Sequence, residues 1–439
     1  MQDAVRERAA APADESDNFI PVRKTDILDA LVEHGDFAGD REREQFRQIC
    51  KILSAVYHYE YFDRLEKLRH AYYYFNPELS GQARFPQEAI DSAYRELVEL
   101  FVAVLKGANF VEVTHEEIER AHREDAEVRV ELQAPIEDFR EVRFFRRGHH
   151  NEDIVVPRWL SWGSRTINTT VYDDVVLFVA LKPDTDAADT HRRSRKQRIR
   201  PGCVLIKYFH NIASSDLNAL FPNVRVVMSM LDKLILFVPA ILGGIPILWK
   251  LWSTVTVLFL VIGFYLGFSA ASVEEEHWAG AVAAMTGLIA LGGFIMRQFM
   301  KYQRQSLLYQ KQLSDNIYFR NVNNNAGIFD YIIGAAEEQE CKEAFLAYYF
   351  LQHGTATTQT ELDRTIEAWL KKAFDLDVDF EIDDALGKLE RLGLLKRAGE
   401  RLSVPPPDEA LAQLDKVWDD YFQFSVAAKP AASPADIAT

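Results

Sequence analysis

Two long uncharged runs dominate the pattern of hydrophobic and polar positions along the chain. The first extends from Leu251 to Ala271 and the second from Trp278 to Met296, and only the acidic turn 272–277 separates them. As helices rising 1.5 Å per residue they would be about 31 Å and about 28 Å long, close to the roughly 30 Å hydrocarbon core of a bilayer. We therefore predict a two-helix transmembrane hairpin over residues 251–296.

Basic residues flank this predicted hairpin and are absent from its turn. Lys233 and Lys250 precede the first run, and four basic residues follow the second, namely Arg297, Lys301, Arg304 and Lys311. Positive charge beside a membrane helix marks its cytoplasmic end. We therefore expect both termini to be cytoplasmic.

The stretch before the first run, residues 233–250, is apolar but broken. Pro239, Gly243, Gly244 and Pro246 interrupt it, and proline inside a helix removes a hydrogen bond and clashes with the preceding turn. We expect an interfacial or re-entrant segment here. A third crossing is the alternative, and it would place the terminal domains on opposite sides of the membrane.

The chain before residue 233 divides into two parts by its hydrophobic period. Residues 18–107 repeat apolar positions at helical spacing, as at Phe46, Ile49 and Leu53, and form a predicted helical region. Residues 108–232 form a predicted α/β cytosolic domain, because runs of β-branched and aromatic residues indicate strands. These runs are Val128–Leu132, Val142–Phe145, Val175–Leu181, Cys203–Phe209 and Val224–Met228.

The chain after residue 296 is polar again. Residues 297–340 are predicted to form a stalk helix and a turn, and residues 341–424 resemble a winged-helix domain, with three helices before a short hairpin. Their acidic balance favours protein contact over DNA. The predicted fold class is thus α+β and membrane-anchored, with an N-terminal helical region, an α/β domain, a transmembrane hairpin and a winged-helix-like domain.

One helix near residue 340 combines charged and aromatic side chains in a way that is typical of docking. These residues are Glu337, Glu338, Glu340, Lys342, Phe345, Tyr348 and Tyr349. We expect either that they dock the C-terminal unit onto the α/β domain or onto a neighbouring copy, or that the helix is an ordinary core helix.

Composition limits the class of protein further. The 439 residues are 48% hydrophobic, with three cysteines and a net charge of −16, which excludes a disordered chain and a disulfide scaffold. The negative charge disfavours nucleic-acid binding, because phosphate groups repel it. Only the tails, residues 1–17 and 425–439, are rich in Ala, Pro and Asp, and we predict that they are disordered.

Candidate chemistry is sparse. The densest titratable cluster is His149, His150, Glu152 and Asp153, and the preceding Arg147 and Gly148 are predicted to end a strand and turn. The chain has no P-loop, no dinucleotide fingerprint and no nucleophile-elbow motif. We therefore assign no catalytic residue, expect no cofactor or metal, and treat the cluster as a weak candidate for lipid chemistry at a membrane surface.

The strongest local charge is the basic run over residues 191–200, between two predicted strands. We expect either a solvated loop or a contact with anionic lipid headgroups, to which each basic residue would contribute about 1 kcal/mol, with a nucleic-acid contact as the least favoured alternative. The residues that would make this contact are Arg192, Arg193, Arg195, Lys196, Arg198 and Arg200.

Several segments together resemble the transmembrane protein 143 family. The two longest are Ile206 to Pro246 and Asp315 to Leu351, and YDDVVLFVALK at Tyr172 to Lys182 adds a third. The resemblance implies a shared domain of unknown function and membrane attachment through two spans, but no reaction. Because we see no targeting peptide, it implies a member in the bacterial inner membrane.

These observations favour a non-enzymatic scaffold or adaptor held in the membrane. Its cytosolic domains are expected to bind a protein partner or a second copy, with the lipid bilayer as a further partner and no nucleic acid. An oligomeric channel or transporter built from the hairpin, and a lipid-acting enzyme, remain the alternatives.

Overall fold

The computed structural model describes residues 18–78, 85–114, 117, 131–133, 139–157, 164–183, 201–221, 225–227, 259, 262–264, 266, 275–354 and 356–421. The chain forms two compact units. The first, here called the helix–sheet unit, comprises Met1–His115, Asp138–Ser214 and Asn321–Thr439, and the second comprises Glu116–Glu137 and Ser215–Arg320. Four predicted segments lie outside the described residues: 1–17, 191–200, 233–250 and 425–439.

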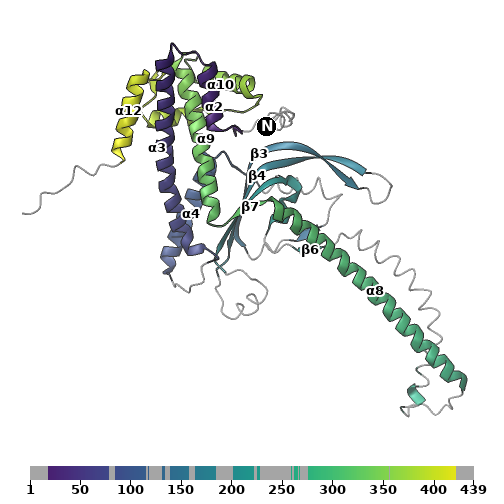
Figure 1. Ribbon diagram of the computed structural model, residues 1–439. Coiled ribbons are helices and arrows are strands. Elements are labelled where there is room, and N and C mark those ends of the chain that lie inside the picture. Colours follow the sequence, from purple (N-terminus) through teal and green to yellow (C-terminus); the bar gives the residue numbers. More distant parts are fainter. Residues whose placement is uncertain are drawn as a thin grey trace, which may run out of the picture. The chain divides into compact units, whose positions relative to one another are not determined.

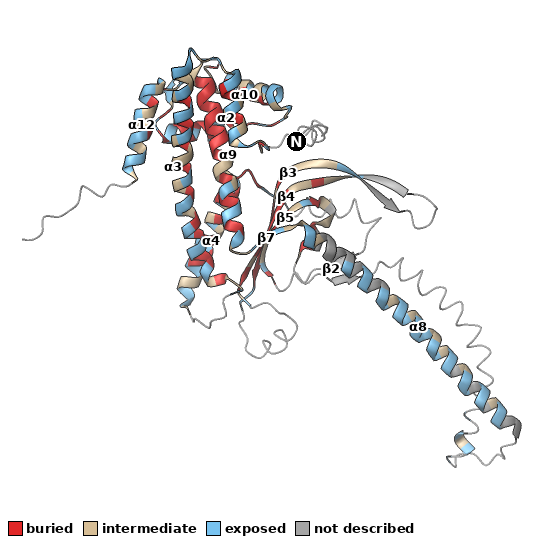
Figure 2. Cartoon of the chain, in the orientation of Figure 1, coloured by how far each residue is buried: buried red, intermediate tan, exposed pale blue. Residues whose placement is uncertain are grey.

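The helix–sheet unit is built around one long helix, α9 (Gly327–Gln352), which is buried along most of its length (Figures 1 and 2). N-terminal helices pack against it, namely α2 (Lys24–His34), α3 (Asp40–Tyr72) and α4 (Gln87–Gly107), with the 3₁₀ turn η1 (Tyr73–Phe75) after α3. Helix α9 begins at Gly327, inside the segment 297–340 for which the sequence predicts a stalk helix and a turn. A helix surrounded on all sides must be apolar around its whole circumference or must pair its charges.

C-terminal elements complete the same body. Helices α10 (Gln359–Phe374) and α11 (Ile382–Arg391) pack on α9, and the hairpin β8 (Lys396–Ala398) and β9 (Arg401–Ser403) follows. Helix α12 (Pro407–Asp420) returns to α3. Helix α10 begins with a capping box. The Thr358 side chain accepts a hydrogen bond from the Glu361 backbone N–H, and the Glu361 side chain accepts one from the Thr358 backbone N–H.

An antiparallel sheet lies beside these helices in the order β1-β3-β4-β5-β7. Its strands are β1 (Val111–Glu112), β3 (Phe139–Pro157), β4 (Ser164–Leu181), β5 (Val204–Ala213) and β7 (Asn321–Asn324). One face joins the core of the helices through Val176, Phe178 and Tyr208, while Val175 and Leu177 on the other face are also buried. Burial on both faces explains the nearly continuous apolar run of β4.

The charges of α9 are paired inside the unit. The Lys388 ammonium of α11 is 6% exposed and lies 2.9 Å from Glu340 and 2.8 Å from Asp384, and it also contacts Glu343. The Lys342 ammonium donates to the Ile20 carbonyl at 2.8 Å.

Other members of the charged and aromatic set predicted to dock also find partners on the N-terminal helices. Glu337 pairs with Lys24 and His58, and the Tyr349 hydroxyl accepts from the Asp36 backbone at 3.0 Å. The set therefore packs the helix against α2, α3 and α11 of its own chain.

The second unit contains a short ladder and a long helix. Strand β2 (Glu131–Gln133) pairs with β6 (Arg225–Val227), and the 3₁₀ helix η3 (Ser214–Leu220) provides Asp216, which lies 3.9 Å from Arg320. Helix α8 (Glu275–Arg320) is 46 residues long.

The predicted two-helix transmembrane hairpin, and with it the membrane-anchored fold class, is wrong. Within the described residues one helix, the Trp278–Arg304 stretch of α8, is long and apolar enough to cross a membrane, by length and composition alone. Most of the first predicted span, 251–271, lies outside the described residues. The second run continues into the predicted stalk because no Gly or Pro between Met296 and Arg320 interrupts the helix. The protein is a mixed helix-and-sheet fold.

Replacing Lys388 with Ala removes the cation that Glu340 and Glu343 share. Removing one partner of a buried ion pair costs about 3–5 kcal/mol, so we expect Lys388→Ala to lower the free energy of unfolding by that amount in urea denaturation. Lys396→Ala, which breaks an exposed pair with Glu409, is the matched control and should cost less than about 1 kcal/mol. Equal effects would contradict a structural role for the buried pairs.

Candidate functional site

Strand β3 carries the four polar residues that the sequence singles out but does not bring them together. In chain order they are His149, His150, Glu152 and Asp153. Successive side chains of a strand point to opposite faces. His150 Nδ1 lies 2.9 Å from an Asp173 oxygen on β4, whereas Glu152 and Asp153 are exposed. The four residues do not converge on one point, and the six basic residues of 191–200 lie outside the described part of the chain.

The turn predicted at Arg147 and Gly148 is wrong. Both residues lie inside β3, whose pairing runs from Arg147 opposite Asp174 to His149 opposite Tyr172. Gly148 has a φ of +65°, a left-handed conformation that residues with a Cβ rarely adopt. Pairing with β4 keeps the chain extended where the Arg–Gly dipeptide on its own indicates a turn.

Three side chains form a row across the three inner strands of the sheet, here called the Arg–Asp–His row. Arg147 on β3 lies opposite Asp174 on β4, and Asp174 lies opposite His210 on β5. Arg147 Nε donates to Asp174 Oδ2 at 2.9 Å, and His210 Nδ1 contacts Oδ1 of the same carboxylate. One buried carboxylate therefore serves two cationic partners.

Arg147 also joins the sheet to two other segments. Its guanidinium carbon lies 4.3 Å from the ring centroid of Phe19 and 4.6 Å from that of Phe110. It donates to the Ala108 carbonyl and to the Tyr208 hydroxyl, both at 3.4 Å. A cation over aromatic faces is stabilised most when water is excluded, so this buried arginine holds the N-terminal segment against the sheet.

The electrostatics of the row favour its charged form. Burial by itself would raise the pKa of Asp174, but the bonds from His210 and Arg147 outweigh it and lower that pKa. The hydrogen bond to Asp174 raises the pKa of His210 above its ordinary value, against the opposing effect of burial.

The raised pKa keeps the His210 imidazole protonated to a higher pH than that of an unpaired histidine, which makes it less suited to act as a general base. The row can therefore act as an ion pair that responds to pH. Within the described residues, no group of three or more His, Cys, Asp or Glu side chains is placed to hold a metal ion.

Sequence reasoning missed Asp174 and His210. The available signal was the charged pair Asp173–Asp174 inside the apolar strand run of β4. A carboxylate in a buried strand needs a partner, but the sequence does not show which residue on a neighbouring strand supplies it.

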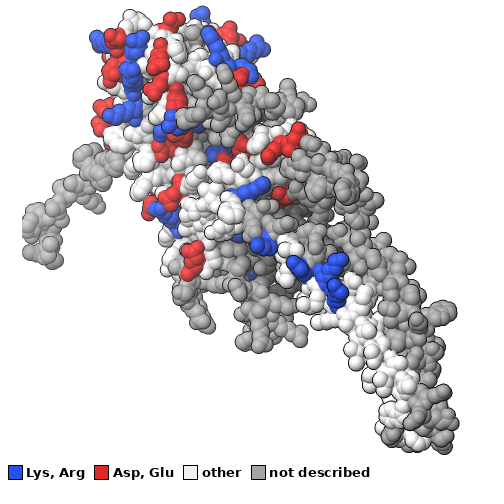
Figure 3. Space-filling model, turned by 45° about the vertical axis from the view of Figure 1, so that its right-hand side comes forward, with Lys and Arg blue, Asp and Glu red and all other residues white. Residues whose placement is uncertain are grey.

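Helix α8 presents a second candidate site, an apolar surface. No described side chain of its Trp278–Arg304 stretch is buried, and the exposed ones include Val282, Met285 and Ile289. Arg297, Lys301 and Arg304 follow the uncharged part. Figure 3 shows basic side chains gathered on one stretch of the helix, with an uncharged surface beyond them.

One family model matches the chain. The family is described as "Protein of unknown function (DUF3754)", and the match covers residues 172–327. It includes Asp174, His210, α8 and β7, and it ends at the first residue of α9. The match covers less than half of the chain and identifies a domain of unknown function in that segment. No solved structure matches the chain.

The His210–Asp174 pair predicts a pH dependence of stability. Because the folded-state pKa of His210 is raised, its contribution is complete below the unfolded-state value of about 6.5 and is lost as pH rises through the folded-state value. We expect the free energy of unfolding, measured with urea from pH 5.5 to 9, to contain a decline that His210→Gln removes. The control His34→Gln, at an exposed helix end, should retain the decline. A decline unchanged in His210→Gln would contradict the assignment.

Proposed function

We propose that the protein is a scaffold or adaptor that works at a lipid bilayer, with α8 as its membrane-associating element. The exposed apolar stretch of α8 carries the proposal. Core helices of soluble proteins can meet the same criterion of length and composition, but such helices are buried, and this stretch is not. A contiguous exposed apolar surface of this kind marks an interaction site.

The dimensions and charges of α8 support this proposal. The uncharged residues from Trp278 to Met296 would extend about 28 Å, close to the thickness of a hydrocarbon core. Arg297, Lys301 and Arg304 lie directly after this run, where basic side chains favour anionic headgroups and the cytoplasmic side. Trp278 lies at the other end, where interfacial aromatic residues are enriched.

The sheet restricts how such a segment is arranged. Strands β5 and β7 are hydrogen-bonded neighbours, although the chain between them includes residues 214–320. In the arrangement that we propose, the chain leaves the helix–sheet unit after β5 and re-enters it at the neighbouring strand β7. We propose that both termini lie on the cytoplasmic side of a bacterial inner membrane, as the resemblance to the transmembrane protein 143 family implies.

The helix–sheet unit would then face the cytoplasm and bind a protein partner or a second copy. Affinity purification of the full chain from native membranes, with and without crosslinking, tests this part of the proposal. We expect one protein to copurify in constant proportion. Recovery of the chain by itself under both conditions would contradict the adaptor role.

Flotation with vesicles of phosphatidylcholine and phosphatidylglycerol tests the membrane association. The wild-type chain should float and resist extraction by carbonate at pH 11. Ile289 is 69% exposed near the middle of the uncharged run. A lysine at the centre of a membrane helix costs about 3 kcal/mol, so Ile289→Lys should weaken partitioning about a hundredfold.

Leu307→Lys is the matched control. Leu307 lies on the same helix, is 63% exposed, and lies beyond the apolar stretch. We expect this variant to float like the wild type. Wild-type chain at the bottom of the gradient, or equal loss in both variants, would overturn the proposal.

A further inference from the structure

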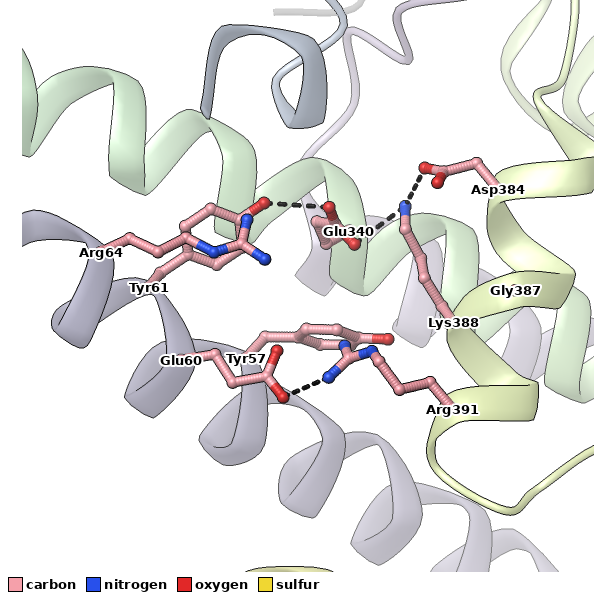
Figure 4. Close-up of a pocket in the computed structure, with 9 residues that line it drawn as sticks. All are labelled: Tyr57, Glu60, Tyr61, Arg64, Glu340, Asp384, Gly387, Lys388 and Arg391. Carbon is pink, nitrogen blue, oxygen red and sulfur yellow. Dashed lines mark hydrogen bonds and ion pairs between the residues drawn. The ribbon is translucent and has the colours of Figure 1, made fainter. Parts of the chain in front are cut away.

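A pocket of about 270 Å³ lies in the helix–sheet unit between α3 and α11, with a residue of α9 in its wall (Figure 4). Its lining consists of charged and phenolic side chains and one glycine. The lining residues are Tyr57, Glu60, Tyr61, Arg64, Glu340, Asp384, Gly387, Lys388 and Arg391. None of them belongs to the Arg–Asp–His row or to α8.

Each of the two helices contributes the same spacing of positions to the pocket. Residues 57, 60, 61 and 64 lie on one face of α3, and residues 384, 387, 388 and 391 lie on one face of α11. Gly387 is inside a short helix, where glycine is unfavourable. A Cβ added there would meet no atom within 4 Å, so packing does not require the glycine, and its missing side chain leaves the pocket open.

Most acidic groups of the lining are already satisfied. Lys388 is shared among Glu340, Glu343 and Asp384 and uses its three donors on them. The second oxygen of Glu340 accepts from the Tyr61 hydroxyl at 2.9 Å.

The remaining carboxylate of the lining, Glu60, is paired through one oxygen, Oε1. It accepts from Arg391 and from the Tyr421 hydroxyl. The three carboxylates of the lining are thus balanced in number by its three cations, Arg64, Lys388 and Arg391.

The groups of the lining that can still form hydrogen bonds are mainly donors. Tyr57 is 1% exposed, its hydroxyl makes no hydrogen bond within the described part of the chain, and the ring points this group toward α11 (Figure 4). Burial raises the pKa of Tyr57, so the hydroxyl keeps its proton and can donate. A buried unpaired donor is unfavourable unless a ligand or water pairs with it.

Arg64 supplies the second set of donors. Its guanidinium lies over the Tyr61 ring, 4.7 Å from the centroid, and no carboxylate among the described residues pairs with it. Arg391 uses one of its nitrogens on Glu60, which leaves others for a ligand. Two guanidinium groups and a phenol thus surround one space, and guanidinium groups prefer planar or tetrahedral oxyanions.

We propose that this pocket binds a small oxyanion, a carboxylate or phosphate group, through Arg64, Arg391 and Tyr57. The volume limits the ligand to a small metabolite. The site joins α3 from the N-terminal part of the chain to α11 from the C-terminal part, so an occupied pocket would stabilise their packing.

Isothermal titration of the full chain with inorganic phosphate, and separately with malonate, tests the proposal and distinguishes the two anion types. We expect saturable binding of at least one, weakened at least tenfold by Arg64→Gln. Tyr57→Phe should also weaken binding while raising the thermal unfolding temperature of the ligand-free protein, because it removes an unpaired buried hydroxyl.

Gly387→Leu fills the open space and should abolish binding while the protein remains folded by circular dichroism. Gly387→Ala is the milder form, in case leucine disturbs the helix, and should weaken binding. Arg47→Gln, an exposed arginine elsewhere on α3, should leave binding unchanged. A pocket that holds only solvent would show no saturable binding of either anion, and that result, or binding unaffected by Arg64→Gln and both Gly387 variants, would overturn the proposal.

Discussion

Burial of the charged helix α9 is the constraint on which the rest of the helix–sheet unit depends. A helix with Glu340, Lys342 and Glu343 in its interior-facing turns is stable only if each charge finds a partner out of water. The partners come from both ends of the chain, because Lys388 belongs to α11 and the Ile20 carbonyl precedes α2. The N-terminal and C-terminal parts therefore fold as one body, although the sequence separates them by a long insertion.

The same body also contains both strands that flank the middle segment of the chain. Because β5 and β7 pair in one sheet, the segment that contains α8 is inserted between two fixed strands. Within that segment, α8 has an apolar stretch whose described side chains are not buried. The membrane association that we propose for α8 would keep the helix–sheet unit at a bilayer, which suits the proposed scaffold role. The pocket between α3 and α11 would add a ligand-dependent element to the same body.

Some elements of the fold follow from the sequence and others do not. The apolar run of Val175–Leu181 lies inside β4, and the run from Trp278 to Met296 is helical. The hairpin prediction is wrong because one helix of the described residues, not two, is long and apolar enough to cross a membrane. The turn prediction at Gly148 failed because strand pairing overrode a local preference. Of the candidate site residues, His150 has a cross-strand partner, but Asp174 and His210 were not foreseen.

The sequence by itself determined features that depend on neighbouring residues. Hydrophobic period and helix length involve contacts within one or two turns, so their signals lie in short windows. Only the tertiary structure decided the Arg–Asp–His row, the pairing of Lys388 with α9 and the pocket beside Gly387. Each of these depends on strand register or helix packing between residues distant in the chain. Such contacts leave no periodic pattern, and a charged residue shows that it needs a partner without showing where the partner lies.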